Sequence, residues 1–258
     1  MSEQPYVESV PPVVVDDEAP SITPEKAKPS GPKMPKWETT ARERVKVSIR
    51  RYSKPLADLL ARDANEGDTR LLVTDILEHA LGFDKYEDLT TEYGVKGEFA
   101  DYGIRIDKEL LAFVEVKRVS TKLSAKHLRQ VEMYAVNEGV EWMILTSGVE
   151  WRAYHLTGGL PVQIDLALDV NLLGDETPTQ KANQLFYLTR ESLKKRQIDE
   201  LWKAKRATSP KSLAAVVGSE PVATAVRKEL KRRTGQNLVT ADIIRLLRET
   251  VMKPECLE

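Results

Sequence analysis

Two carboxylates and an amine stand out because a β-hairpin would bring them together. Two short runs rich in apolar residues flank a polar loop at 107–109, which predicts antiparallel strands at 100–106 and 110–117. This pairing sets Asp101 opposite Glu115, with Cβ atoms about 4.5–5.5 Å apart. Since side chains alternate along a strand, Glu115 and Lys117 share a face. We therefore expect Asp101, Glu115 and Lys117 to converge at one end of the hairpin.

The chemistry that such a cluster could support is metal-assisted hydrolysis. Two close carboxylates repel each other, and burying either one unpaired is costly. A Mg²⁺ ion, which is usually held by one or two carboxylates plus water and phosphate oxygens, would resolve the repulsion. It would lower the pKa of a bound water and stabilise charge on phosphorus, while Lys117 would orient the hydroxide or offset phosphate charge. The alternative is a structural ion pair of Lys117 with Glu115 or Asp101, and spacing leaves both interpretations open.

The elements around the hairpin predict an α/β fold. One hairpin face is almost purely apolar and belongs in a core: Tyr102, Ile104, Ile106, Leu110, Ala112, Val114 and Val116. Upstream, Thr40 and Glu43 form a capping-box pattern that opens a helix, which Pro55 should kink or restart. Its apolar positions have helical spacing: Val45, Ile49, Tyr52, Leu56 and Leu59.

Further helices and strands follow from the same periodicities. A second helix fits 66–81, with Gly82 as the residue that ends it, and 94–97 is expected to be a loop. The other expected elements are a helix at 124–138, strands at 142–146, 151–156 and 162–166, a long helix at 178–206, and helices near 220–233 and 239–251.

Several stretches together resemble the PD-(D/E)xK nuclease superfamily. The segments ADYGI (100–104) and FVEVK (113–117) carry its Asp and Glu-x-Lys, although Ala100 stands where the family has proline. NEGDTR (65–70), LGFD (81–84) and RQVEMY (129–134) match further motifs in order. The chain is most similar over about 60–170 to the N-terminal nuclease domain of type I restriction enzyme R subunits.

This resemblance implies a restriction-endonuclease-like core, with a mixed central sheet flanked by helices, and Mg²⁺-dependent DNA cleavage with Mn²⁺ as a substitute. Asp101, Glu115 and the Val116 carbonyl would hold the metal, and Lys117 would be the catalytic amine. Glu66 would be an accessory acid, unless its charge merely stabilises a helix N-terminus. Gln130 and Tyr134 would brace Lys117 or contact DNA, unless they are ordinary packing and surface residues.

The chain departs from the R subunits because it has no GxxxxGK[ST] phosphate loop, which excludes ATP-driven translocation by the residues given. We expect a nuclease that acts as a homodimer or with separate motor or specificity subunits in restriction-modification. The alternative is a catalytically silent DNA-binding or protein-interaction module of a defence or repair complex.

Basic clusters predict where DNA phosphates would lie. The expected contacts are Arg50, Arg51, Lys54, Arg118, Lys122 and Arg129. Each cluster equally fits a solvated helix surface, and no base-reading motif is evident. Glu78 is a weaker candidate acid, and His79, His127 and His155 lack the spacing of metal ligands.

Composition and charge set the domain organisation that we expect. The 258 residues carry 39 basic and 40 acidic groups, one cysteine and no long apolar run, which favours a cytoplasmic protein without a membrane partner. Residues 1–36 hold 8 of the 14 prolines and are predicted to be a disordered tail. The nuclease core would span 37–175, and a basic, all-helical extension would span 176–258.

Overall fold

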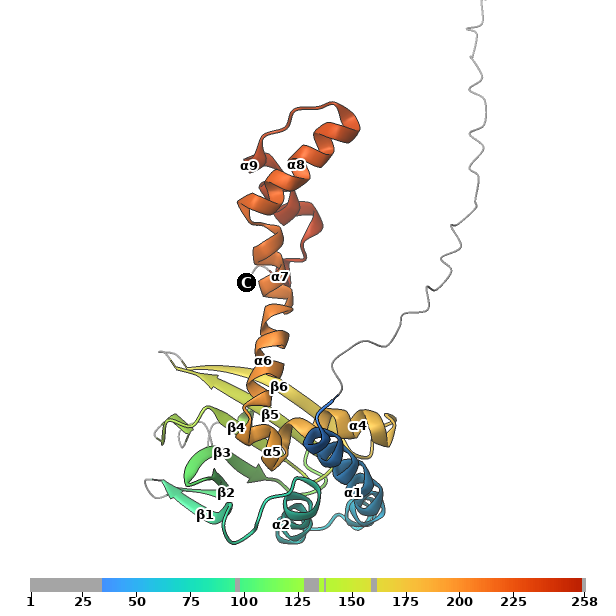
Figure 1. Cartoon of the computed structure of the whole chain (residues 1–258), viewed down its shortest axis with the longest axis vertical. Coiled ribbons are helices and arrows are strands. Elements are labelled where there is room, and N and C mark those ends of the chain that lie inside the picture. The colour runs from blue at the N-terminus through green and yellow to red at the C-terminus, as the bar shows by residue number, and fades with distance from the viewer. Residues whose placement is uncertain (1–33, 96–97, 128–134, 137, 159–161, 257–258) are drawn as a thin grey trace, which may run out of the picture. The chain divides into compact units, whose positions relative to one another are not determined.

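The computed structural model describes residues 34–95, 98–127, 135–136, 138–158 and 162–256. The chain divides into Met1–Met34 and Pro35–Glu258, and the predicted tail lies mostly outside the described residues. The second unit is an α/β structure built on a six-stranded mixed sheet (Figure 1). The predicted α/β class and mixed sheet are therefore confirmed.

The strands of the sheet lie in chain order, β1-β2-β3-β4-β5-β6. They are β1 (Leu89–Val95), β2 (Glu98–Ile106), β3 (Glu109–Val116), β4 (Trp142–Thr146), β5 (Glu150–Thr157) and β6 (Gln163–Asn171). Only β3 and β4 are parallel, and the other neighbours are antiparallel. A parallel pair requires a crossover connection, and the segment between β3 and β4 supplies it.

The α-helices of the described residues precede and follow the sheet. They are α1 (Lys36–Ala61), α2 (Glu66–Asp75), α4 (Pro178–Leu185), α5 (Arg190–Lys194), α6 (Gln197–Ala207), α7 (Pro210–Val217), α8 (Glu220–Thr234) and α9 (Thr240–Leu246). None of the helices described is long and apolar enough to cross a membrane.

The β2–β3 hairpin differs from the prediction in its turn but not in its register near Asp101. The loop has two residues, Asp107 and Lys108, both with positive φ (52° and 74°), as a type I′ turn requires. A bulge next to Arg105 then adds one residue to β3, so that Tyr102 still pairs with Val114. The same bulge moves Leu110, predicted for the core face, to the opposite face of the sheet.

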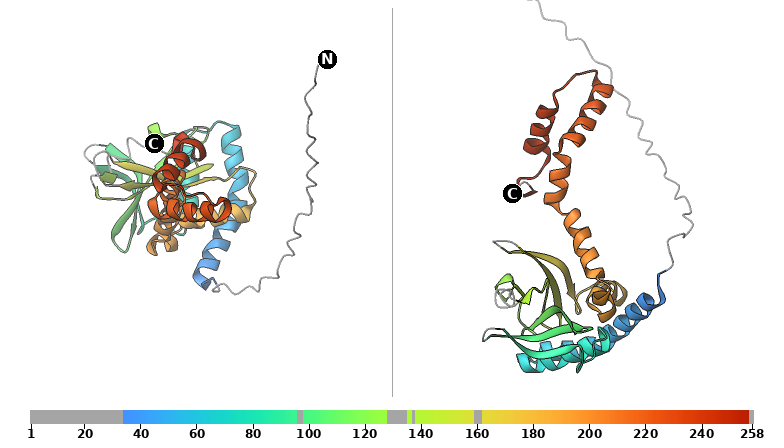
Figure 2. Two further views of the ribbon diagram at one scale, coloured as in Figure 1. Left: turned by 90° about the horizontal axis from the view of Figure 1, so that it is seen from above. Right: turned by 60° about the vertical axis from the view of Figure 1, so that its left-hand side comes forward.

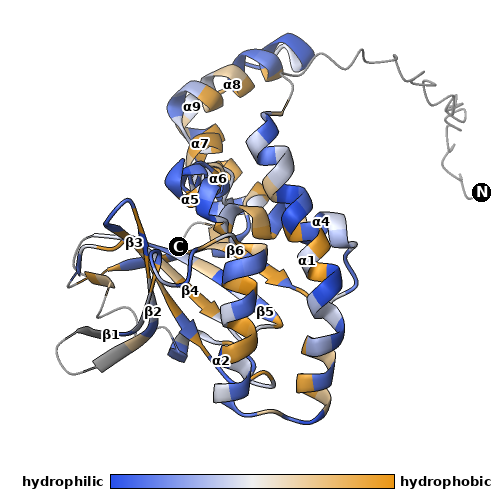
Figure 3. Cartoon of the chain, turned by 60° about the horizontal axis from the view of Figure 1, so that its bottom comes forward, coloured by the Kyte–Doolittle hydropathy of each residue, from blue (hydrophilic) through white to orange (hydrophobic). Residues whose placement is uncertain are grey.

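The two faces of the sheet bury separate cores. One face of the sheet packs against α1, α2 and the helices from α4 to α6 (Figure 2). The core on this face includes Val114, Val116 and Trp151. Helices α1 and α2 each carry both hydrophobic and hydrophilic residues (Figure 3). Amphipathic helices place the hydrophobic residues on one face, at a spacing of three or four residues. The other face holds a smaller cluster around Phe113, Met143 and Leu145. The C-terminal half of β3, Ala112–Val116, is therefore buried, including the polar residue Glu115.

Helix α1 begins earlier than predicted and does not break. It starts at Lys36 after Pro35, so the Thr40 capping box lies inside the helix and caps nothing. The helix continues through Pro55, which costs one backbone hydrogen bond. The predicted apolar positions are all buried, because the helix packs against α4 and the α2 segment in the core that it shares with the sheet.

Helix α2 begins where the sequence indicates. The Asn65 side chain caps it by accepting a hydrogen bond from the backbone N–H of Asp68 (2.8 Å). The helix continues as a π-helical turn, Ile76–Ala80, and Gly82 (φ +81°) ends it as predicted. The predicted loop at 94–97 is wrong at Gly94 and Val95, which lie in β1, while 96–97 lie outside the described residues.

The strands predicted at 142–146 and 151–156 and the helices predicted near 220–233 and 239–251 are confirmed. The predictions that fail do so mainly where a helix is interrupted. The expected helix at 178–206 is three α-helices with a 3₁₀ turn at Phe186–Leu188, and Arg196 (φ 55°) separates α5 from α6. Strand β6 extends to Asn171, and α7 was not predicted. The expected helix at 124–138 begins as a 3₁₀ turn at Ala125–His127, and residues 135, 136 and 138 are helical as predicted, while 128–134 and 137 lie outside the described residues.

Candidate active site

The central strands of the sheet place the predicted carboxylates and amine in one cluster. Asp101 lies on β2, Glu115 lies on β3, and Lys117 directly follows β3. Asp101 Oδ2 accepts a hydrogen bond from the backbone N–H of Val116 (2.7 Å), which ties the side chain to the neighbouring strand. Lys117 Nζ donates to Glu115 Oε1 (2.6 Å), so the amine lies against the buried carboxylate.

Burial dominates the electrostatics of the two carboxylates. The side chains of Glu115 and Asp101 are only 6% and 10% exposed. Desolvation raises the pKa of Glu115, and the charge of Asp101 adds to this, while the hydrogen bond from Lys117 opposes it. Desolvation likewise raises the pKa of Asp101 against the Val116 N–H and the Arg70 charge. Both groups are thus less stable as anions than exposed carboxylates are.

Arg70, to which the sequence assigned no role, completes the cluster. Arg70 Nη2 lies 2.5 Å from Asp101 Oδ1 and 4.0 Å from Glu66 Oε1. The charge of Glu66 also raises the pKa of Asp101, so Glu66 is close to the site, as expected of an accessory acid. The i,i+4 spacing of Glu66 and Arg70 on one helix was the signal that could have identified the arginine.

Polar contacts fasten the start of α2 to the segment after β3. Thr69 Oγ1 accepts from the backbone N–H of Val119 (3.0 Å), and both groups are buried. Arg118 donates to the Asp63 carbonyl (2.7 Å) and forms an ion pair with the Asp63 carboxylate. On the strand side, the Lys117 backbone N–H donates to the Thr146 carbonyl of β4 (2.7 Å). Lys117 is therefore held between α2 and the sheet.

The donor set fits a hard divalent cation. Glu115 Oε2 is buried and has no hydrogen-bond partner among the described residues, so this oxygen is available to a ligand. With Asp101 and the Val116 carbonyl it offers oxygen atoms only, as Mg²⁺ prefers. Asp101 Oδ1 is available only if Arg70 moves away.

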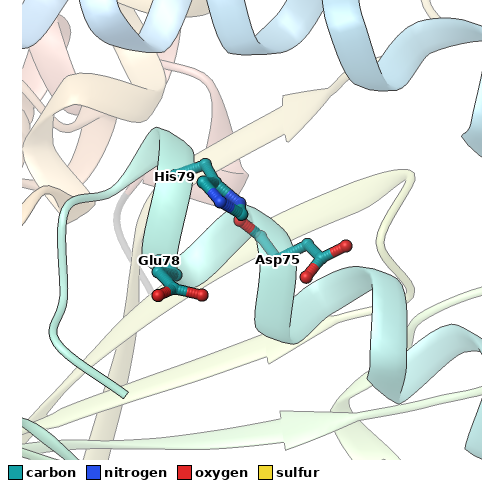
Figure 4. Close-up of side chains that lie close together, drawn as sticks. All are labelled: Asp75, Glu78 and His79. Carbon is teal, nitrogen blue, oxygen red and sulfur yellow. The ribbon is translucent and has the colours of Figure 1, made fainter.

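A second acidic group, which the sequence reasoning did not assemble, lies on the far end of the α2 segment. Ligand atoms of Asp75, Glu78 and His79 lie within 4.8 Å of one another (Figure 4). The i, i+3, i+4 spacing was the signal for this group. Two of its three members already have partners: His79 Nδ1 lies 2.9 Å from the Tyr52 hydroxyl, and Glu78 pairs with Lys85 at 3.3 Å.

The predicted nucleic-acid contacts are distributed over several elements. Arg50, Arg51 and Lys54 are exposed on α1, and Lys122 is exposed in the segment after β3. Arg118 is exposed as well but is engaged by Asp63, as described above. The predicted residues Arg129, Gln130 and Tyr134 lie outside the described residues.

No family model, curated protein or solved structure matches the chain. A functional proposal therefore depends on the geometry of its own residues.

Proposed function

We propose that the chain is a Mg²⁺-dependent nuclease of the PD-(D/E)xK type that hydrolyses DNA phosphodiester bonds. The observation that carries the proposal is Glu115, a carboxylate buried beside Asp101 with one oxygen unpartnered. An unsatisfied buried polar atom costs about 1–3 kcal/mol, and a well-packed apolar side chain would be more stable at this position. A bound ion would supply the missing partner.

The mixed sheet is compatible with a restriction-endonuclease-like core related to the nuclease domain of type I R subunits. Asp101, Glu115 and the Val116 carbonyl would hold Mg²⁺ or Mn²⁺, which lowers the pKa of a bound water and stabilises charge on the phosphate. Lys117, positioned by Glu115, would donate a hydrogen bond to the attacking water or to a phosphate oxygen. Glu66 would be an accessory acid near the metal or its water, and Gln130 and Tyr134 would brace Lys117 or contact the DNA backbone.

Exposed cations on α1 and after β3 support binding to the DNA backbone. Arg50, Lys54 and Lys122 would contact phosphates without reading sequence. Binding should weaken as salt rises, because phosphate contacts release condensed counterions. Partners would be DNA and either a second copy of the chain or separate motor or specificity subunits, in the cytoplasm.

A cleavage assay with matched variants tests the proposal. Purified wild-type chain is incubated with end-labelled single- and double-stranded DNA and with RNA, with Mg²⁺, Mn²⁺ or EDTA. We expect divalent-dependent products from wild type and a loss of at least about 100-fold in Glu115→Gln and Lys117→Ala. Glu109→Gln, an exposed change on the same strand, is the control and should cleave normally.

The alternative function is a DNA-binding or protein-interaction module without turnover. The ion pair of Arg70 with Asp101 favours it, because it occupies a carboxylate that the metal would need. DNA binding without divalent-dependent products would support this alternative, and equal cleavage by wild type, Glu115→Gln and Lys117→Ala would refute the assigned site.

A further inference from the structure

Arg70 occupies the position at which a divalent cation would meet Asp101. Its Nη2 atom lies 2.5 Å from Asp101 Oδ1, whereas Asp101 Oδ2 is taken by the Val116 N–H. Both oxygens of Asp101 are thus engaged. The guanidinium is therefore the counter-ion of Asp101 in the metal-free protein.

The arginine is not held as a purely structural residue would be. Its Nε atom is buried and has no hydrogen-bond partner among the described residues. A fixed, bidentate ion pair would use the planar fork of the guanidinium on both carboxylate oxygens. Here the Nε arm of that fork has no partner, so the ion pair with Asp101 leaves part of the guanidinium unsatisfied.

An alternative partner for the guanidinium lies one helical turn away. Glu66 Oε1 is 4.0 Å from the same Nη2 atom, and the side chains of Arg70 and Glu66 are 37% and 44% exposed. A modest rotation of the Arg70 side chain would exchange Asp101 for Glu66. This would leave Asp101 Oδ1 free for a ligand, and Glu115 Oε2 already has no hydrogen-bond partner among the described residues.

We infer that Arg70 is an exchangeable counter-ion, which neutralises Asp101 in the metal-free site and which a divalent cation must displace towards Glu66 on binding. The inference rests on the proposed metal site. It makes Arg70 a positioning residue that competes with the metal and lowers its affinity. It also explains how a pair of buried carboxylates is tolerated before the ion arrives, since a positive charge is already beside them.

Calorimetric titration of Mn²⁺ into the full chain, without nucleic acid, tests this competition. Arg70→Gln keeps a long polar side chain but removes the cation, and Arg70→Lys keeps the charge. We expect Arg70→Gln to bind Mn²⁺ about tenfold more tightly than wild type, since one charge-assisted contact no longer has to be broken. Arg70→Lys should bind less tightly than Arg70→Gln. Arg62→Gln, which removes an exposed arginine paired with Asp68 (3.2 Å), is the matched control and should bind as wild type does.

The outcomes separate the inference from the proposed function. If wild type binds Mn²⁺, Glu115→Gln does not, and Arg70→Gln binds equally or more weakly than wild type, the metal site stands and the competing role of Arg70 is wrong. If neither wild type nor Arg70→Gln binds, the metal site itself is wrong, and the inference is overturned with it.

A second measurement does not depend on the folding of an Arg70 variant. In ¹⁵N-labelled wild type, the buried Nε–H of Arg70 gives a side-chain resonance that Mg²⁺ should shift as the guanidinium leaves Asp101. The same resonance should not respond in Glu115→Gln. If calorimetry reports metal binding to wild type but this resonance does not shift, Arg70 does not leave Asp101 and the inference is wrong.

Discussion

At the scale of single residues, burial separates the chemistry of this chain from its many surface charges. Most ion pairs are exposed and contribute little to stability. Glu115 differs because its side chain is buried and its Oε2 atom has no hydrogen-bond partner among the described residues. A charged residue in such a place is costly for folding. It is therefore the residue whose role most requires an explanation beyond stability.

His155 is a second buried titratable residue, and it predicts a pH dependence of stability. Its ring stacks on the Trp202 ring, with 3.6 Å between ring centroids, and lies edge-on to the Trp142 ring, with 4.9 Å between centroids. Burial lowers the pKa of His155 below 6.5, against the nearby charges of Glu141, Asp199 and Asp165. The unfolded state therefore binds a proton more readily, so His155 stabilises the fold above about pH 6.5 and loses this contribution as pH falls.

The variant His155→Phe keeps an aromatic ring and removes the titration. We expect thermal unfolding between pH 7.5 and 5 to show a smaller acid loss of stability in His155→Phe than in wild type. If the unfolding temperatures of the two proteins fall equally with pH, the pKa of His155 is not lowered in the folded state.

At the scale of elements, the important contact is a buried hydrogen bond between α2 and the segment after β3. The buried Val119 N–H has Thr69 Oγ1 as its partner. This hydrogen bond fixes the chain two residues after Lys117. Helix α2 also supplies Glu66 and Arg70, so both sides of the candidate site depend on the same contact.

Replacing Thr69 tests this connection. Thr69→Val keeps the shape of the side chain but leaves the Val119 N–H unsatisfied, which should lower the free energy of unfolding by about 1–3 kcal/mol. Thr69→Ser keeps the hydroxyl acceptor, so its free energy of unfolding should fall clearly less than that of Thr69→Val. Urea denaturation of the three proteins makes the comparison, and equal losses in Val and Ser variants would attribute the effect to packing alone.

At the scale of the whole molecule, the C-terminal helices do not form one uniform extension. Leu185, Leu188, Leu193 and Ile198, from α4 to α6, belong to the same core as α1 and the sheet. In α7 to α9 the buried apolar residues are few: Ala214, Ala223 and Ile243. The fold thus needs α4 to α6, whereas α7 to α9 contribute little to its core.

Two truncations test this division. A chain ending at Thr208 should unfold cooperatively at a temperature close to that of the full chain, because the sheet core is intact. A chain ending at Asp175 exposes the core surface that α4 to α6 cover and should show no cooperative transition in circular dichroism. Native-like unfolding of the shorter chain would place α4 to α6 outside the core.

The sequence alone was sufficient for features that depend on local periodicity. Alternation along the hairpin predicted which residues of β2 and β3 face the main core, except at Leu110, and helical spacing with Gly82 as the stop signal predicted the helix from Glu66. These features follow from neighbours in the chain. They were correct wherever packing did not oppose them.

Tertiary structure decided the features that depend on residues distant in the chain. The positive φ of Lys108 and the bulge beside Arg105 are set by strand pairing, and together they moved Leu110 to the other face. Helix α1 continues through Pro55 because its apolar face remains buried in the main core, against α4 and the α2 segment. Arg70 reaches Asp101 only because α2 packs against β3. Sequence spacing predicts which side chains share a face of one element, but the contact between two elements, and hence the partner of a buried charge, is fixed only when their surfaces pack.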